Sequence, residues 1–322
     1  MKKLLLGSAL AASVLLAGSS YAETKVSGYL ETTVTSSETK TSGVAGASTP
    51  SNIGHEASID LNTSKELDNG FKMSAGFGMQ DGTQVDQYLK LATGNTTLAI
   101  GSDVTGVADN VSQEDFTPHI AQSLHETDIG NIAGVRSVHG GNAFYLIQKS
   151  DMLTFEGAYA PTQAGGDAEA SSTNGQTGSG YDLAVHGNLG VEGLKVGYGI
   201  SEESNLGLSS STLESKSMGI KYGISGFTVG YGQSENSTIA NVDTTNTTYG
   251  VSYAVSDALS VGVYAGTVEV DAVINDEEHK SVQLGYDFGG LGLTVGYYEA
   301  SDVGGVRGTD ESLLEVRTVT KF

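Results

Sequence analysis

The chain has 322 residues, with 45 glycines, three prolines, no cysteine and no tryptophan, and its formal net charge is -22. This acidic balance argues against nucleic acid as a partner, because phosphates require a basic protein face. A chain without cysteine forms no disulfides. Beyond the N-terminus, no stretch offers the roughly 20 consecutive apolar residues that a membrane-spanning helix requires.

The N-terminus has the pattern of a secretory signal peptide. Lys2 and Lys3 precede an apolar run over residues 4–17, and the small residues Ser20 and Ala22 follow at positions -3 and -1 of a cleavage site. The apolar run is too short to span a bilayer. We therefore expect residues 1–22 to be removed, leaving 23–322 as the mature protein.

From residue 25 onward, apolar side chains recur at every second position in segments of roughly ten residues, which is the pattern of strands with one apolar face. The Asp68-Asn69-Gly70 sequence between two such segments indicates a tight hairpin. We expect a polar loop over residues 35–52. The predicted strands are 25–34, 53–64, 71–79, 85–93, 96–101, 136–148, 151–160, 181–185, 194–200, 218–222, 227–231, 249–253, 259–263, 282–288, 293–297 and 314–322.

About sixteen strands whose connections alternate between short and long are typical of an outer-membrane barrel. A soluble sandwich also alternates, but here the apolar register is nearly free of charge. Exceptions such as Glu214 and Lys216 fall at strand ends, where a bilayer would meet water. The prediction is an all-β, transmembrane antiparallel barrel of about 16 strands, located in the outer membrane of a Gram-negative bacterium.

One long acidic segment, residues 102–135, interrupts this pattern. It shows no sustained period, and structureless inserts of this length are usually functional or disordered. Thr117-Pro118 resembles a helix start within it. We expect the segment to fold into the lumen and narrow it, although an exposed surface loop is the alternative. Its carboxylates are Asp103, Asp109, Glu114, Asp115, Glu126 and Asp128.

A barrel of this size leaves a water-filled lumen, and charge and width at the narrowest point then set selectivity. The excess of carboxylates predicts a mild preference for cations. We expect Lys72, Lys90 and Arg317 to be the wall bases that face the insert. The acids on the luminal register are Glu31, Glu56, Asp60, Asp86, Glu156, Asp182, Asp287 and Glu315.

Three short stretches resemble the general diffusion porins of Gram-negative outer membranes. Residues 65–72 are similar to that family's first periplasmic turn, and residues 97–101 are similar to its fifth strand, which ends in glycine before the long third loop. The last strand closes on Phe322, as family members usually do. Ser102 departs from the family, which often has a base at that position, and the family's loop motif is not recognisable.

This resemblance implies a homotrimer of sixteen-stranded barrels with the third loop folded inward. It also implies that the barrel-assembly machinery recognises the C-terminal strand through Phe322, and that lipopolysaccharide surrounds the outer rim. The function implied is passive diffusion of ions and small hydrophilic solutes, with no enzymatic activity.

Other readings of the sequence remain open. A solute-specific porin would be expected to line its pore with a row of aromatic side chains or a ring of basic ones. A non-conducting barrel used for adhesion or structure would be expected to be plugged or narrow. No Gly-x-Ser-x-Gly or His-Glu-x-x-His motif points to a hydrolase. No cofactor is expected, although the acidic loop with Asp271, Asp276, Glu277 and Glu278 offers oxygen ligands for Ca²⁺.

Overall fold

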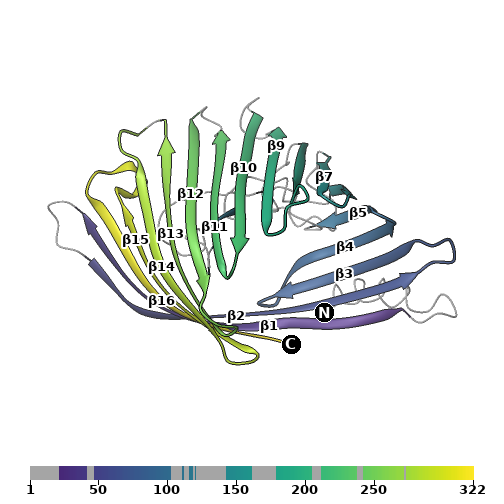
Figure 1. Cartoon of the computed structure of the whole chain (residues 1–322), viewed down its shortest axis with the longest axis horizontal. Coiled ribbons are helices and arrows are strands. Elements are labelled where there is room, and N and C mark those ends of the chain that lie inside the picture. The colour runs from purple at the N-terminus through teal and green to yellow at the C-terminus, as the bar shows by residue number, and fades with distance from the viewer. Residues whose placement is uncertain are drawn as a thin grey trace.

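The computed structural model describes residues 22–41, 47–102, 111, 116–118, 120, 143–161, 179–204, 212–237, 242–271 and 273–322. Sixteen antiparallel strands form one closed barrel, in which each strand pairs with its neighbours in sequence and β1 pairs with β16 (Figure 1). The first eight strands are β1 (Glu23–Thr41), β2 (Ala47–Glu66), β3 (Lys72–Gln80), β4 (Thr83–Thr93), β5 (Thr96–Ser102), β6 (Ala143–Lys149), β7 (Leu153–Ala160) and β8 (Gly180–Gly187). The others are β9 (Leu194–Ser204), β10 (Thr212–Ile224), β11 (Phe227–Ser237), β12 (Asp243–Ala254), β13 (Leu259–Val270), β14 (Glu277–Asp287), β15 (Leu291–Ser301) and β16 (Thr309–Lys321).

The fold class, strand number and closure predicted from the sequence are confirmed. Among the described residues, no helix is both long and apolar enough to cross a membrane. The predicted signal peptide, residues 1–22, lies outside the described part except for its last residue.

The largest departure from the prediction lies in the first hairpin. Residues 35–52 were expected to form a loop, but β1 continues to Thr41 and β2 begins at Ala47. The two strands remain paired as far as Thr39 and Ala47, with one register shift between Thr35 and Ser37. The prediction of a loop was wrong because a strand can continue without an apolar face once it leaves the bilayer.

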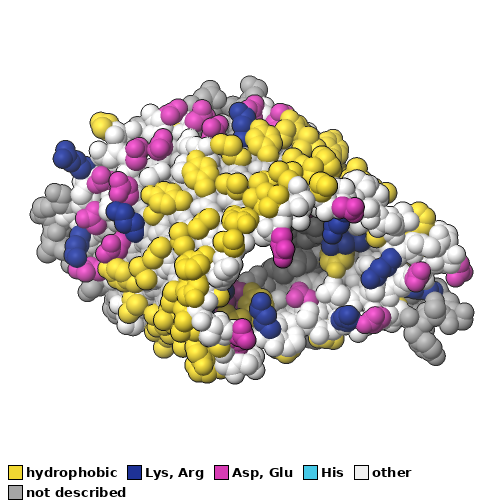
Figure 2. Space-filling model, in the orientation of Figure 1, with side chains coloured by type: hydrophobic (Ala, Val, Ile, Leu, Met, Phe, Trp, Pro, Cys, Tyr) yellow, Lys and Arg dark blue, Asp and Glu magenta, His cyan; other side chains and the backbone are white. Residues whose placement is uncertain are grey.

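The predicted apolar register forms the outer surface of the barrel. Side chains such as Leu30, Phe144 and Val263 are more than half exposed, at 54%, 56% and 53%. Outward aromatic side chains contact one another near the tight turns, where Phe227 stacks on Tyr253 with ring centroids 4.3 Å apart. Figure 2 shows hydrophobic side chains gathered in a broad band on the outside, beside a hollow rimmed by charged side chains. Such a surface suits lipid.

Candidate functional site: the inner wall of the barrel

The inner wall is formed by the side chains on the strand face opposite to the apolar one, and this face continues from strand to strand around the barrel. On β1 to β4, for example, Glu31 is paired with Glu56, and Gly76 links Asn62 to Tyr88. Because strand residues alternate between faces, these side chains all point inward. Predicted wall residues on this register are Glu31, Asp60, Asp86, Lys72, Lys90, Glu315 and Arg317.

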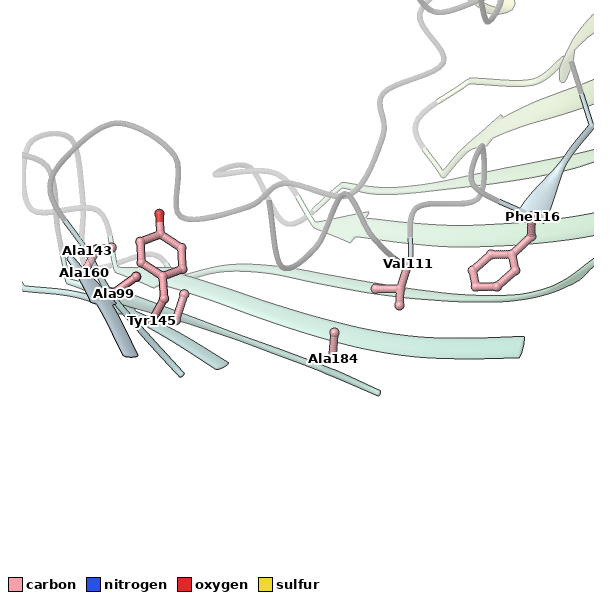
Figure 3. Close-up of a cluster of buried hydrophobic side chains, with 8 residues drawn as sticks. Ala99, Val111, Phe116, Ala143, Tyr145, Ala160 and Ala184 are labelled. Carbon is pink, nitrogen blue, oxygen red and sulfur yellow. The ribbon is translucent and has the colours of Figure 1, made fainter. Parts of the chain in front are cut away.

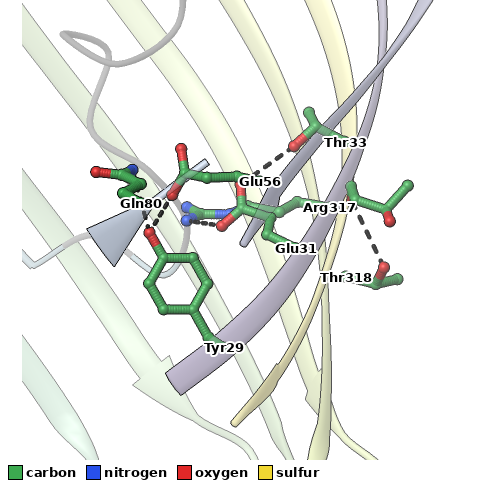
Figure 4. Close-up of polar contacts among 8 residues, drawn as sticks. Tyr29, Glu31, Thr33, Glu56, Gln80, Arg317 and Thr318 are labelled. Carbon is green, nitrogen blue, oxygen red and sulfur yellow. Dashed lines mark hydrogen bonds and ion pairs between the residues drawn. The ribbon is translucent and has the colours of Figure 1, made fainter. Parts of the chain in front are cut away.

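Arg317 does not stand free on the wall as a base facing the insert. Its guanidinium forms an ion pair with the carboxylate of Glu31 across the β1–β16 junction (Figure 4). Thr33 also donates a hydrogen bond to Glu31, at 3.2 Å. Two charges that the sequence assigned separate roles therefore largely compensate each other within the wall. The acidic neighbour Glu315 is buried on the same strand as Arg317.

A second pair of inward polar side chains is in contact on the far side of the barrel. His186 Nε2 is 2.9 Å from Glu156 Oε1, and both side chains belong to the inward register of β7 and β8. The sequence predicted Glu156 on the luminal register, but not its contact with His186.

A chain of inward polar contacts runs over β1 to β3. The hydroxyl of Tyr29 donates to the carboxylate of Glu56, and Gln80 donates from its amide to the same hydroxyl at 3.4 Å (Figure 4). Tyr29 and Gln80 were not among the predicted site residues. The signal that could have found them is their position on the luminal register, where a long polar side chain can reach its neighbours.

Lys90 is held by an aromatic ring. The ring of Tyr88 lies over Gly76, where an added Cβ would overlap it, and the Tyr88 hydroxyl donates to Asn62 on β2. The ammonium of Lys90 lies 4.2 Å from the centroid of that ring. A cation over a ring face is attracted by the ring quadrupole. Lys90 is thus positioned on the wall by the Tyr88 ring, and no carboxylate in the described part of the chain forms an ion pair with it.

The remaining predicted wall residues are described here by their positions on the strands. Lys72 is the first residue of β3 and is exposed, and Asp60 is half-buried on β2. The backbone of Asp86 is in β4, but its side chain lies outside the described part. The six predicted insert carboxylates also lie outside it: Asp103, Asp109, Glu114, Asp115, Glu126 and Asp128.

Apart from Ser102, which ends β5, five residues of the insert are described, and they contact the inward register of distant strands. Val111 and Phe116 are fully buried in a cluster with small inward side chains such as Ala184 (Figure 3). Thr117 Oγ1 is 2.7 Å from Thr248 Oγ1 of β12. The amide of Ile120 donates to Gln283 Oε1 of β14 at 2.7 Å. Pro118, expected to open a helix, is not helical.

Within the described residues, no group of three or more His, Asp or Glu side chains is arranged to hold a metal ion. In the loop considered for Ca²⁺, Glu277 and Glu278 belong to opposite faces of β14. Glu277 accepts a hydrogen bond from the Gly304 amide at 2.8 Å and lies 2.9 Å from His279. Glu278 is instead paired with Lys280.

Comparison with solved structures gives the same fold. OprB of Pseudomonas putida at high pH is 10% identical, with 93% of this chain and 94% of that chain covered and a TM-score of 0.69. An anion-selective porin from Comamonas acidovorans is 14% identical, with 94% and 100% covered and a TM-score of 0.65. A porin refined at 1.8 Å has the same identity and TM-score, with 93% and 100% covered. At these identities the likeness shows the fold alone.

No curated protein sequence matches the chain. A family model described as Gram-negative porin matches residues 9–316, which is nearly the whole length. With the closed sixteen-stranded barrel, this match confirms the resemblance seen in the short sequence stretches: the chain belongs to the Gram-negative porin family.

Proposed function

We propose that the protein is a water-filled outer-membrane channel through which ions and small hydrophilic solutes diffuse passively, with a mild preference for cations. The family and the fold support an outer-membrane diffusion channel. The observation that carries the proposal is the division of the barrel wall into an apolar outer register and an inner register bearing residues such as Glu56, Asp60 and Lys90. No catalytic activity is proposed.

The insert is proposed to form the constriction. In support, its described residues Phe116, Thr117 and Ile120 contact inward positions on β10 to β14. Its carboxylates would then lie within the lumen, where charge at the narrowest point decides which ions pass.

The preference for cations rests on charge balance. The chain as a whole carries -22, and residues 102–135 of the insert contain no Lys or Arg. An anion-selective porin shares the fold, so the sign of selectivity depends on side chains and not on the barrel. Screening over about 8 Å at physiological ionic strength limits the bias to a modest one.

Conductance across a planar bilayer with a salt gradient tests the proposal. The wild type is expected to give steady steps and a reversal potential of cation-selective sign. Glu114→Gln with Asp115→Asn should move that potential toward zero, whereas the control pair Asp271→Asn with Asp276→Asn, in an outer loop, should leave it unchanged. If both pairs leave it unchanged, Glu114 and Asp115 do not lie in the pore; absence of conductance would favour a non-conducting barrel.

The same proposal includes how the chain is processed and which partners it has. The mature chain is proposed to begin at Glu23 after cleavage, which N-terminal sequencing of the membrane protein tests. It is proposed to form a homotrimer, so conductance steps should come in threes. Lipopolysaccharide is proposed to surround the outer rim, and the barrel-assembly machinery to bind the strand that ends at Phe322.

A further inference from the structure

A buried pair of titratable side chains lies at the outer mouth, which is the end of the barrel opposite to the tight turns. Glu277, the first residue of β14, and His279 share the inward register of Gln283, and their exposed fractions are 3% and 0%. Glu277 Oε1 is 2.9 Å from His279 Nε2. Neither ring nitrogen of His279 makes a hydrogen bond to another described residue. Buried polar side chains are usually hydrogen-bonded, so this histidine needs an explanation.

The connection between β15 and β16 folds back over this part of the inner face. In the sheet, His279 is paired with two small residues, Gly266 of β13 and Ala300 of β15. Val303, which follows β15, packs against an apolar cluster on the same face. The cluster consists of Tyr264, Val268, Tyr298, Ala300 and Leu313. Residues 302–305, which we call the outer turn, therefore lie against the inner face at the mouth.

Polar contacts hold the outer turn as well. The Gly304 amide donates a hydrogen bond to Glu277 Oε2 at 2.8 Å. The carbonyl oxygen of Gly305 accepts one from Asn275 Nδ2, in the connection between β13 and β14, at 3.3 Å. A Cβ added to Gly305 would lie 2.6 Å from the Cβ of Val273 in the same connection. Of these contacts, only the one to Glu277 involves a group whose charge changes with pH.

We propose that Glu277 and His279 form a pH-sensitive latch, which holds the outer turn against the inner face at the mouth and releases it in acid. A backbone amide binds a charged carboxylate more strongly than a neutral carboxyl group. The charged carboxylate also compensates a proton on His279, and a buried cation without compensation is costly. A proton taken up by Glu277 therefore weakens both contacts at once, and separation of the turn lets water reach the pair.

Other titratable groups lie around the pair. Among the described residues, those that face it from the neighbouring strands or belong to the outer turn are Tyr264 of β13, Tyr298 of β15, Glu311 of β16 and Asp302. Asp302 accepts a hydrogen bond from the Gly308 amide at 2.6 Å. Glu278 and Lys280 lie on the opposite face of β14 and pair with each other. Acid neutralises the other carboxylates as well as Glu277, so the test has to single out Glu277.

Cysteine accessibility tests the latch, and the chain has no cysteine of its own. Ala300→Cys places a thiol beside His279 at a position that is 1% exposed. Gly54→Cys places one at an exposed glycine, where an added Cβ meets nothing within 4 Å. The ratio of the two modification rates by one water-soluble thiol reagent removes the effect of pH on the thiol itself.

The ratio should rise about tenfold or more from about pH 7 to about pH 4, the range in which imidazole and carboxyl groups ordinarily titrate. A tenfold change corresponds to about 1.4 kcal/mol, which is the scale of a hydrogen bond to a charged group. A ratio that does not change with pH in the wild-type background overturns the latch.

Two variants single out Glu277. Glu277→Gln keeps an acceptor for the Gly304 amide but cannot change its charge, so the ratio should lose most of its dependence on pH. The matched control, Glu278→Gln, removes the same charge from the opposite face of the same strand and should keep the rise of the wild type. A rise that is as large in Glu277→Gln as in the wild type, or that is lost equally in both variants, overturns the latch.

A reversible lock tests whether the outer turn acts on the pore. Val273→Cys with Gly305→Cys should form a disulfide on oxidation, because the two positions are adjacent. The reduced form carries the same substitutions and is the matched control. In planar bilayers the wild type and the reduced form should give steady single-channel currents at neutral pH and fluctuating ones in acid, whereas the oxidised form should give steady currents in both.

Each outcome of the recording bears on a different claim. Failure to cross-link, or fluctuation of the oxidised form in acid, overturns the docking of the outer turn. Steady wild-type currents in acid, together with a rise in labelling, overturn its position at the mouth. Only this effect on current rests on the proposed channel function. A barrel that conducts no current contradicts that function instead, and the labelling ratio still decides whether the latch exists.

Discussion

At the scale of single residues, the charges of the lumen differ in how far they are compensated. Arg317 shares its charge with Glu31 through a direct ion pair, whereas Lys90 is held over the ring of Tyr88. A permeating ion meets the field of a compensated pair as a dipole, which falls off faster than the field of a single charge. Lys90 should therefore influence selectivity more than Arg317.

This difference gives a prediction about selectivity. Lys90→Gln should increase the cation-to-anion permeability ratio about twofold. A unit charge about 8 Å away in water is worth roughly 0.5 kcal/mol to each ion, with opposite signs for a cation and an anion, and screening at physiological ionic strength reduces both energies to about a third. Reversal potentials measured in a salt gradient report this ratio. The change should shrink at high salt, where screening is stronger.

The matched variant is Arg317→Gln, which also removes one positive charge. It leaves Glu31 buried without its ion-pair partner, so a lower thermal unfolding midpoint is expected together with the selectivity change. An Arg317→Gln shift larger than that of Lys90→Gln would contradict this account of the two bases.

The sequence predicted which face each of these side chains occupies but not which of them meet. Period two assigns Glu31 and Arg317 to the lumen, yet the two residues are 286 positions apart and become neighbours only when β16 closes on β1. The same limit applies to Phe116, which the sequence placed in the insert without any sign that glycines on β9 to β11 would receive it. Contacts made by closure are not encoded in local alternation.

At the scale of elements, strand ends were harder to predict than strand number. β1 continues to Thr41 and β2 begins at Ala47, although a loop was predicted over residues 35–52. Apolar alternation marks a strand only where lipid covers its outer face. Beyond the bilayer both faces meet water. Ser, Thr and Asn residues therefore continue the hydrogen-bonded ladder there without the apolar alternation by which a strand is recognised in the sequence.

The tight turns are more fully specified by sequence, and the turn after β14 shows why. Asp287 accepts hydrogen bonds from the amides of Gly289 and Gly290, at 2.7 and 3.1 Å. Both glycines have positive φ, at 84° and 120°, a region that favours glycine. The Gly290 and Gly289 amides lower the pKa of the Asp287 carboxyl below its ordinary value of 3.8.

A pH dependence of stability follows. Because the folded state lowers the pKa of Asp287, the turn stabilises the barrel above the ordinary pKa of 3.8, and this contribution is lost as the pH falls toward the lowered value. Asp287→Asn should lower the thermal unfolding midpoint of the detergent-solubilised barrel at pH 7. The difference between variant and wild type should narrow as the pH falls below 3.8. A difference that stays constant across that window would show that the carboxylate charge is not what stabilises the turn.

At the scale of the whole molecule, one junction closes the barrel. β1 pairs with β16 from Tyr29–Lys321 to Thr41–Thr309. The last residue extends this pairing: Gly28 N–H donates to Phe322 O at 3.0 Å, and Phe322 N–H donates to Gly28 O at 3.1 Å. The Phe322 ring lies over Gly28, where an added Cβ would be 2.9 Å from the ring. Phe322 is therefore part of the closure as well as the proposed assembly signal.

These two roles can be separated by experiment. Gly28→Val keeps Phe322 intact for recognition but places a branched side chain where the ring and the Ser58 carbonyl lie, an overpacking that costs about 1–3 kcal/mol. If closure matters, Gly28→Val should lower the unfolding midpoint of purified barrels refolded in detergent without any assembly machinery, and deletion of Phe322 should do the same. The control Gly54→Val changes a glycine at which an added Cβ meets nothing within 4 Å. If only recognition matters, refolded barrels of all three variants will match the wild type, and only the deletion of Phe322 will reduce the amount of barrel assembled in cells.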